Sequence, residues 1–115
     1  MINVLLDLSP EGLLRGFRAS GHAEGAVVGS NIACAAVTTL LRTAARLCAE
    51  RGIVEDGDAS GPGEMRVVLS RKADGVSSGW LGGVTEFLLR GLGDLQGEYP
   101  GEVIMRIAQD GHSLR

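Results

Sequence analysis

The pattern of apolar residues along the chain predicts four β-strands. Residues 2–8 form a short, branched apolar run that ends in a cluster of turn residues at 9–12, as strands commonly do. Residues 13–20 are the expected return strand of a hairpin. Apolar and polar positions alternate again at 64–70, and a last apolar run covers 102–108. We therefore expect one sheet built from these four segments.

Apolar residues at helical spacing predict two helices. The first covers about 32–51, with Asn31 as its N-cap and Gly52 as its stop. The second covers 78–96, and the acidic, glycine-rich residues 55–63 are expected to form a turn. The apolar stripe of the first helix comprises Val37, Leu40, Leu41, Ala44, Leu47 and Cys48, and that of the second comprises Leu81, Val84, Leu88, Leu92 and Leu95.

The resulting element order, ββαβαβ, predicts an α+β fold. We expect a two-layer sandwich in which a four-stranded sheet carries two helices on one face. With 115 residues, the chain is expected to form a single domain at 1–115, because this length buries roughly two-thirds of the unfolded surface. Residues 23–31 are expected to form a mobile loop, and residues 109–115 a polar tail.

Glycine is the unusual component of the composition. The chain has 18 glycines, roughly twice the average share, and only four aromatic residues. Several glycines lie in the second predicted helix, where each costs about 1 kcal/mol relative to alanine. Packing against a second copy of the chain would offset this cost, so we expect a homodimer. The glycines concerned are Gly82, Gly83, Gly91 and Gly93.

Charge and hydropathy exclude several classes of protein. Eleven basic and fourteen acidic residues give a net charge of −3, and Arg71–Lys72 is the only adjacent basic pair. Direct nucleic-acid binding is therefore not expected, because it normally requires a basic patch. The longest uncharged stretch, 25–41, is too polar for a membrane span, and residues 1–7 do not resemble a secretory signal. Two cysteines without such a signal indicate the reducing cytoplasm.

One cysteine is placed where a nucleophile would be expected. Cys34 follows the proposed N-cap Asn31 by three residues, and the helix dipole favours a thiolate in a first turn. His22 closes the preceding strand, so the loop between them can bring the imidazole to the sulfur. On the residues alone, this spacing is more often a coincidence, because free cysteines are commonly buried as small hydrophobes.

The remaining candidates for chemistry are weaker. Cys48 lies on the apolar face of the same helix, about 21 Å from Cys34 along the axis, so the two cannot pair and Cys48 is expected to be buried. His112 lies in the polar tail and is expected to be solvated. His22 and Cys34 supply only two metal ligands, and no C-x-x-C or H-x-x-x-H spacing occurs, so neither a metal nor a cofactor is expected.

The segment 21–38 resembles the signature of the ribosomal-processing cysteine proteases, the Prp family. That signature is G-H-A, a variable loop, and then G-x-D-I-V-C-A-A-V-S. The length of the chain and its predicted element order are also similar to those of the family. The chain carries Gly21-His22-Ala23, a glycine-containing loop, and then Gly29-Ser30-Asn31-Ile32-Ala33-Cys34-Ala35-Ala36-Val37-Thr38.

The resemblance implies a cysteine endopeptidase of ribosome biogenesis. Family members remove a short N-terminal extension from protein twenty-seven of the large ribosomal subunit, cutting beside aromatic residues. The implied roles are general base for His22 and nucleophile for Cys34, with the first-turn amides of the helix, including that of Cys34, binding the oxyanion. The implied protein is a cytoplasmic homodimer whose partner is the N-terminal segment of the ribosomal protein. The residues expected to bind substrate or shape the loop are Gly21, Ala23, Gly29, Ser30 and Thr38.

The chain departs from the family signature at two positions. Asn31 stands where Asp is usual, and an asparagine orients an imidazole or caps a helix but does not stabilise an imidazolium by charge. An alternative is therefore a non-catalytic, ribosome-associated binding protein with the same fold. Thr38 stands where Ser is usual, and its hydroxyl is expected either to contact substrate or to bond back into its own helix.

Overall fold

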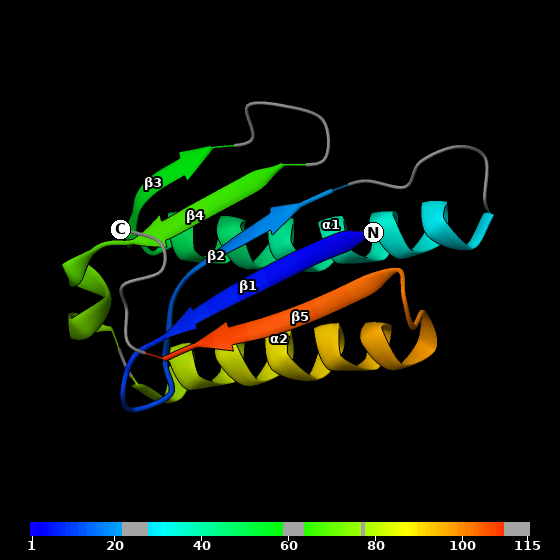
Figure 1. The fold of residues 1–115 in the computed structure, drawn as a ribbon. Coiled ribbons are helices and arrows are strands. Elements are labelled where there is room, and N and C mark those ends of the chain that lie inside the picture. Colours follow the sequence, from blue (N-terminus) through cyan, green and yellow to red (C-terminus); the bar gives the residue numbers. More distant parts are fainter. Residues whose placement is uncertain (22–27, 59–63, 77, 110–115) are drawn as a thin grey trace.

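The computed structural model describes residues 1–21, 28–58, 64–76 and 78–109. Its strands form one mixed sheet in the order β3-β4-β2-β1-β5, and both long helices lie on the same side of it (Figure 1). The elements are β1 (Ile2–Leu8), β2 (Leu14–Ser20), α1 (Val28–Glu50), β3 (Val54–Asp58), β4 (Met65–Leu69), the 3-10 helix η1 (Arg71–Gly75), α2 (Ser78–Glu98) and β5 (Val103–Ala108).

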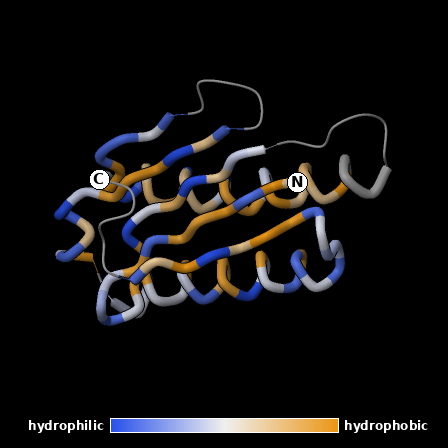
Figure 2. The backbone as a smooth tube through the Cα atoms, viewed as in Figure 1, coloured by the Kyte–Doolittle hydropathy of each residue, from blue (hydrophilic) through white to orange (hydrophobic). Residues whose placement is uncertain are grey.

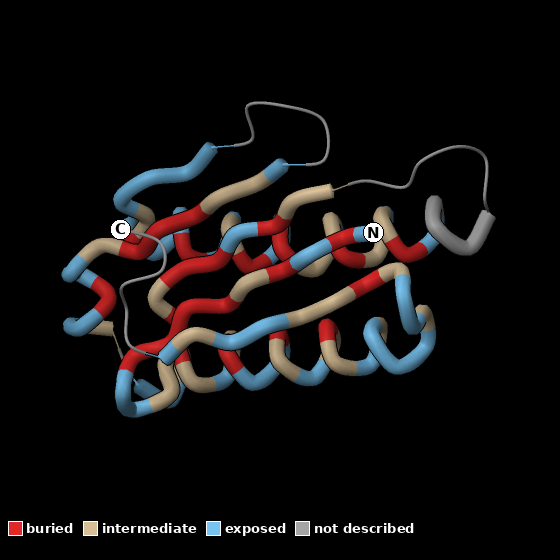
Figure 3. Tube along the Cα trace, in the orientation of Figure 1, coloured by how far each residue is buried: buried red, intermediate tan, exposed pale blue. Residues whose placement is uncertain are grey.

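The predicted four-stranded sheet is wrong, because the sheet has five strands. The additional strand is β3, which lies where the sequence predicted a turn at 55–63. Its side chains after Val54 are all exposed, as Figure 3 shows, so it has no apolar alternation to reveal it. β3 pairs with β4 alone, at the edge of the sheet, and backbone hydrogen bonds are therefore its main attachment. The α+β class and the two helices are as predicted.

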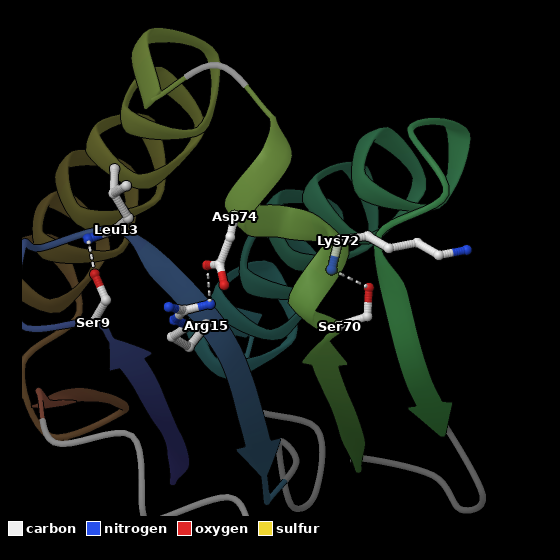
Figure 4. A network of polar contacts seen from close by, with 6 residues as sticks. All are labelled: Ser9, Leu13, Arg15, Ser70, Lys72 and Asp74. Atoms are coloured by element: carbon white, nitrogen blue, oxygen red, sulfur yellow. Dashed lines mark hydrogen bonds and ion pairs between the residues drawn. The ribbon is translucent and has the colours of Figure 1, made fainter.

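The sheet combines an antiparallel centre with one parallel edge. β1 pairs antiparallel with β2, placing Leu6 opposite Phe17, and pairs parallel with β5, placing Ile2 beside Val103. The β1–β2 turn is closed by Ser9, whose hydroxyl accepts a hydrogen bond from the Leu13 amide at 3.1 Å (Figure 4). Both ends of the β2 strand are thus defined by contacts to β1.

A short polar network holds η1 against β2. Arg15 forms an ion pair with Asp74 at 2.8 Å, and the Ser70 hydroxyl accepts a hydrogen bond from the Lys72 amide at 3.3 Å (Figure 4). The Ser70 hydroxyl therefore caps η1 at its first turn. This network fixes the connection that carries the chain from β4 to α2.

The core lies between the sheet and the two helices. Figure 2 shows apolar residues along β1 and β5 and at intervals along both long helices. The stretch Ile32–Glu50 of α1 is long and apolar enough to cross a membrane, and 28% of it is buried inside the protein, at Ala33, Val37, Leu41, Ala44 and Cys48. Leu47, expected in the apolar stripe of this helix, is exposed instead. Buried residues include Ile2, Val4, Leu6 and Leu8 of β1, Ala33, Val37, Leu41, Ala44 and Cys48 of α1, and Leu81, Leu88 and Leu92 of α2.

The two helices approach each other at Gly91. A Cβ atom at this position would lie 2.9 Å from Cδ1 of Leu40, so a larger residue there would displace the end of the Leu40 side chain. Gly83 and Gly93 have no atom within 4 Å of a Cβ, so packing within the chain does not account for them. Of the glycines for which we expected a second copy of the chain as the packing partner, Gly91 packs against α1 of the same chain instead.

We predict that alanine changes the stability of the fold differently at Gly93, which has open space around it, and at Gly91, which lies beside Leu40. Gly93→Ala is expected to stabilise the fold by about 1 kcal/mol, because the space is open and alanine favours the helix. Gly91→Ala is expected to stabilise less or to destabilise, because the Leu40 side chain has to move. Urea unfolding of both variants tests this, and an equal gain in the free energy of unfolding would contradict the close approach of the helices.

Thr85 connects α2 to β2 through a buried hydroxyl. Its Oγ1 accepts a hydrogen bond from the Leu14 amide at 2.9 Å and donates one to the Leu81 carbonyl at 2.8 Å. Leu14 begins its strand, so this contact sets where β2 starts relative to α2. Valine has nearly the same shape as threonine but does not accept the amide hydrogen bond.

We predict that Thr85→Val lowers the free energy of unfolding by about 1–3 kcal/mol, because it leaves the buried Leu14 amide without its acceptor. Thr39→Val is the matched control, since its hydroxyl donates to the Ala35 carbonyl at 2.8 Å on the exposed side of α1. Urea unfolding measures both. If the two substitutions lower the free energy of unfolding equally, the hydrogen bond between Thr85 and Leu14 does not stabilise the fold.

Candidate active site

Gly21 turns the chain away from the end of β2. Its φ of +93° lies in the left-handed region, which residues other than glycine rarely adopt. A Cβ atom at this position would also overlap the carbonyl oxygen of Met1. Only glycine therefore fits between the start of β1 and the segment that leads to His22. His22 and Ala23 lie outside the described residues, so the predicted contact between His22 and Cys34 stays a prediction.

The expected N-cap at Asn31 is wrong, because α1 begins at Val28. Gly29, Ser30 and Asn31 therefore belong to the first turn of α1 rather than to the loop expected at 23–31. Their small and polar side chains carry no apolar periodicity, so the pattern alone did not reveal this turn. The preference of asparagine for N-caps is a tendency that the surrounding chain overrides here.

This helix start moves the unpaired amides away from Cys34. At the start of an α-helix the N–H groups of the N-cap and the first three helical residues lack an intrahelical acceptor, and in α1 these helical residues are 28–30. Cys34 is the seventh residue of α1 and lies in its second turn. The expectation that its own amide is a free first-turn donor is therefore wrong, and so is the argument that placed its thiol in the first turn.

The two cysteines lie in different surroundings. Both are free thiols, and Cys34 is half-buried at the margin of the core while Cys48 is buried. Desolvation by burial raises the pKa of the Cys48 thiol, so this residue is disfavoured as a thiolate nucleophile. The prediction that Cys48 is buried is confirmed. Cys34 is therefore the better candidate nucleophile of the two.

Thr38 lies close to Cys34 on the surface of α1. Four residues correspond to a rotation of about 40° around the helix, so the two side chains share one side of it. Thr38 is half-buried, and its hydroxyl has no hydrogen bond within the part of the chain that the structure describes. The bond back into the helix that was one expectation for Thr38 is made instead by its neighbour, Thr39.

A polar hollow of about 270 Å³ lies where β2 runs toward Gly21. Across the strands Arg18 stands opposite Arg66, and Arg66 is neutralised by an ion pair with Asp56 at 2.8 Å. Sequence reasoning missed this hollow because its lining comes from three strands far apart in the chain. Among the described residues, no group of three His, Cys, Asp or Glu side chains is placed to hold a metal ion. The hollow is lined by Arg18, Ala19, Ser20, Asp58, Glu64, Met65 and Arg66.

Solved structures of similar fold include known proteases. A Streptococcus mutans protein is 25% identical, with 96% of each chain covered and a TM-score of 0.75. The essential ribosomal processing protease Prp of Staphylococcus aureus, in complex with a substrate peptide, is 16% identical and has a TM-score of 0.74. Its complex with a covalently linked product peptide is 19% identical, with a TM-score of 0.70. Both S. aureus comparisons cover 93% of this chain and 99% of the other.

A comparison with curated proteins finds no significant match. The sequence model of the family described as cysteine protease Prp matches residues 1–104, which is nearly the whole chain of 115 residues. The match includes the segment 21–38, which supplies both candidate catalytic residues. It also includes every described element up to the start of β5. The chain therefore belongs to the cysteine protease Prp family and is a cysteine protease.

Proposed function

We propose that this protease removes the N-terminal extension of a large-subunit ribosomal protein, protein twenty-seven, during ribosome maturation in the cytoplasm. The observation that carries the proposal is the family match over residues 1–104, which includes Cys34. The S. aureus relative is a ribosomal processing protease that has been seen with a substrate peptide and with a covalently linked product peptide. Cys34 is half-buried at the margin of the core, and a cysteine that is not fully buried suits such covalent chemistry.

In the proposed mechanism, His22 takes the proton from the Cys34 thiol and the sulfur attacks the scissile carbonyl carbon. The resulting oxyanion collapses and expels the amine, which His22 protonates, leaving a thioester on Cys34. Water then hydrolyses the thioester with His22 as the base. Because the unpaired helical amides at the start of α1 belong to residues 28–30, we assign the oxyanion donors to these amides rather than to that of Cys34.

Asn31 is the residue on which the choice between a cutting enzyme and a non-catalytic binding protein depends. Its side chain is neutral, so it offers a protonated His22 a hydrogen bond but no charge. A chain that binds the ribosomal protein without cutting it would keep the fold and lose only this chemistry. The substitution Asn31→Asp restores the residue that the family signature carries and therefore separates the two functions.

We predict that the purified protein cuts a peptide spanning the extension of the host's protein twenty-seven. Cys34→Ala and His22→Ala are each expected to lower the rate by roughly 10³-fold or more, because each removes one half of the reacting pair. Cys48→Ala is the matched control and should still cut, since its thiol is buried away from solvent. Mass spectrometry of the products measures all four proteins.

Cleavage that survives Cys34→Ala would overturn the mechanism. If the native protein binds the peptide without cutting it and Asn31→Asp cuts it, the binding function is favoured over processing. An unchanged rate in Asn31→Asp would show that the neutral side chain suffices.

We also propose that the protein is a homodimer that associates through the outer side of α2. Phe87 is 62% exposed there, and Gly83, one turn earlier, leaves open space beside it. An exposed phenylalanine next to a glycine offers a second copy both an apolar side chain and room for one. The interface would also offset the helix cost of the α2 glycines that no packing within the chain explains.

We predict a dimer by light scattering at micromolar concentration, and a monomer for Phe87→Glu, because the substitution places a charge in the apolar contact. Thr43→Glu, which changes an exposed residue on the outer side of α1, is the control and should remain dimeric. A monomeric native protein would contradict the proposal. A dimeric Phe87→Glu variant would place the interface elsewhere.

A further inference from the structure

A groove of about 390 Å³ lies between α1 and the β3–β4 hairpin, apart from the residues of the family signature. Its floor and walls are mainly apolar, and its charged residues stand at the rim. The apolar lining comprises Ala45 and Ala49 of α1, Val54 of β3, and Met65 and Val67 of β4, and the charged lining comprises Arg42, Arg46, Asp58 and Arg66.

The rim of the groove has an excess of positive charge. Arg42 and Arg46 are exposed, and neither forms an ion pair within the described part of the chain. They are four residues apart on one helix, where like charges destabilise each other. Arg66 is already paired with Asp56, and among the described residues that line the groove Asp58 is the only acidic one. A carboxylate from a ligand would therefore relieve the repulsion between the two helix arginines.

The groove continues the side of α1 that carries the candidate nucleophile. Ala45 follows Cys34 by eleven residues, which is close to three full helical turns, so both lie on one side of the helix. Thr38 and Arg42 occupy the turns between them. The distance along the axis is about 16 Å, which an extended peptide covers in about five residues. A peptide lying along this side of α1 would pass from the scissile bond into the groove.

The edge of the sheet favours an extended ligand. β3 ends the strand order, so one of its edges has no neighbouring strand in the sheet and can pair with a peptide backbone. Gly57 lines the groove from β3 and has no side chain to obstruct such a peptide. The polar hollow beside β2 shares Asp58, Met65 and Arg66 with the groove, so the two depressions are adjacent.

We propose that this groove binds an extended segment of the substrate, about five residues from the scissile bond, that carries an acidic side chain between apolar ones. The carboxylate lies between Arg42 and Arg46, and the apolar side chains lie against Ala45, Ala49 and their neighbours on β3 and β4. The identification of the peptide as substrate rests on the proposed proteolysis. The binding of an acidic, apolar strand does not.

The first test compares a long and a short peptide with the same cleavage sequence. The long peptide has eight residues on each side of the scissile bond, and on each side a Val-Glu-Val sequence places Glu at the fifth residue from the bond. The short peptide has three residues on each side of the bond. Arg42→Glu/Arg46→Glu is expected to lower the ratio of kcat/KM for the long peptide to that for the short one about 10-fold, through KM. Arg71→Glu/Arg90→Glu changes the charge equally, away from the groove, and should keep the ratio of the native protein.

An unchanged ratio in Arg42→Glu/Arg46→Glu would overturn the proposal. A long peptide in which Gln replaces both Glu residues should lose the advantage over the short peptide in the native protein. If the Gln peptide keeps that advantage, the arginines do not recognise a carboxylate and the proposal fails.

The second test does not need catalysis. A fluorescein-labelled peptide of eight alternating Val and Glu residues is titrated with the Cys34→Ala protein, and binding is followed by anisotropy. We expect binding that weakens with salt and is lost with Arg42→Glu/Arg46→Glu. Ala49→Trp, which fills the groove without changing charge, should weaken it at least 10-fold, whereas Thr43→Trp on the outer side of α1 should not.

The two tests separate this proposal from the proposed function. If the native protein cuts neither peptide but binds the labelled one through the groove, the proteolytic function fails and the binding site stands. If the native protein cuts the peptides but neither the arginine pair nor Ala49→Trp affects binding, the function stands and the groove proposal is overturned.

Discussion

Packing of one side of α1 into the core determines where the candidate site lies. The stripe that includes Ala33, Val37 and Leu41 is buried, and this fixes the rotation of the helix about its axis. Cys34 follows Ala33 by one residue and is therefore rotated by about 100° out of the core. That rotation leaves Cys34 half-buried at the margin of the core. The same rotation directs Arg42 and Ala49 toward the edge strand rather than toward α2.

The sequence predicted best those elements whose contacts are apolar and periodic. β1 has the predicted bounds, and α2 and β5 differ from theirs by one or two residues. In α2 the buried positions Leu81, Leu88 and Leu92 recur at helical spacing. β3 was missed because an exposed edge strand is attached by its backbone, which leaves no hydrophobic pattern. The first turn of α1 was missed for a similar reason, since the residues before Ile32 carry no apolar stripe.

The parts of the candidate site that are close together in the sequence could be predicted, and the parts assembled from distant segments could not. Residues 21–38 lie close together in the chain, so their spacing could be recognised and both candidate catalytic residues named. The groove and the polar hollow are assembled from α1, β2, β3 and β4, and no local pattern indicates that Ala49 and Met65 line one surface. Their prediction required the strand order, which depended on the strand that the sequence did not reveal.

The close approach of Gly21 to the Met1 carbonyl bears on how the protein should be handled. A purification tag fused ahead of Met1 would leave the fold beside Gly21, one residue before His22 in the chain. β5 runs parallel to β1 and ends with Ala108 beside Asp7, at the far end of the sheet from Ile2. A tag placed after the last residue therefore follows a strand that runs away from the candidate site, and it is the better choice for assays of cleavage.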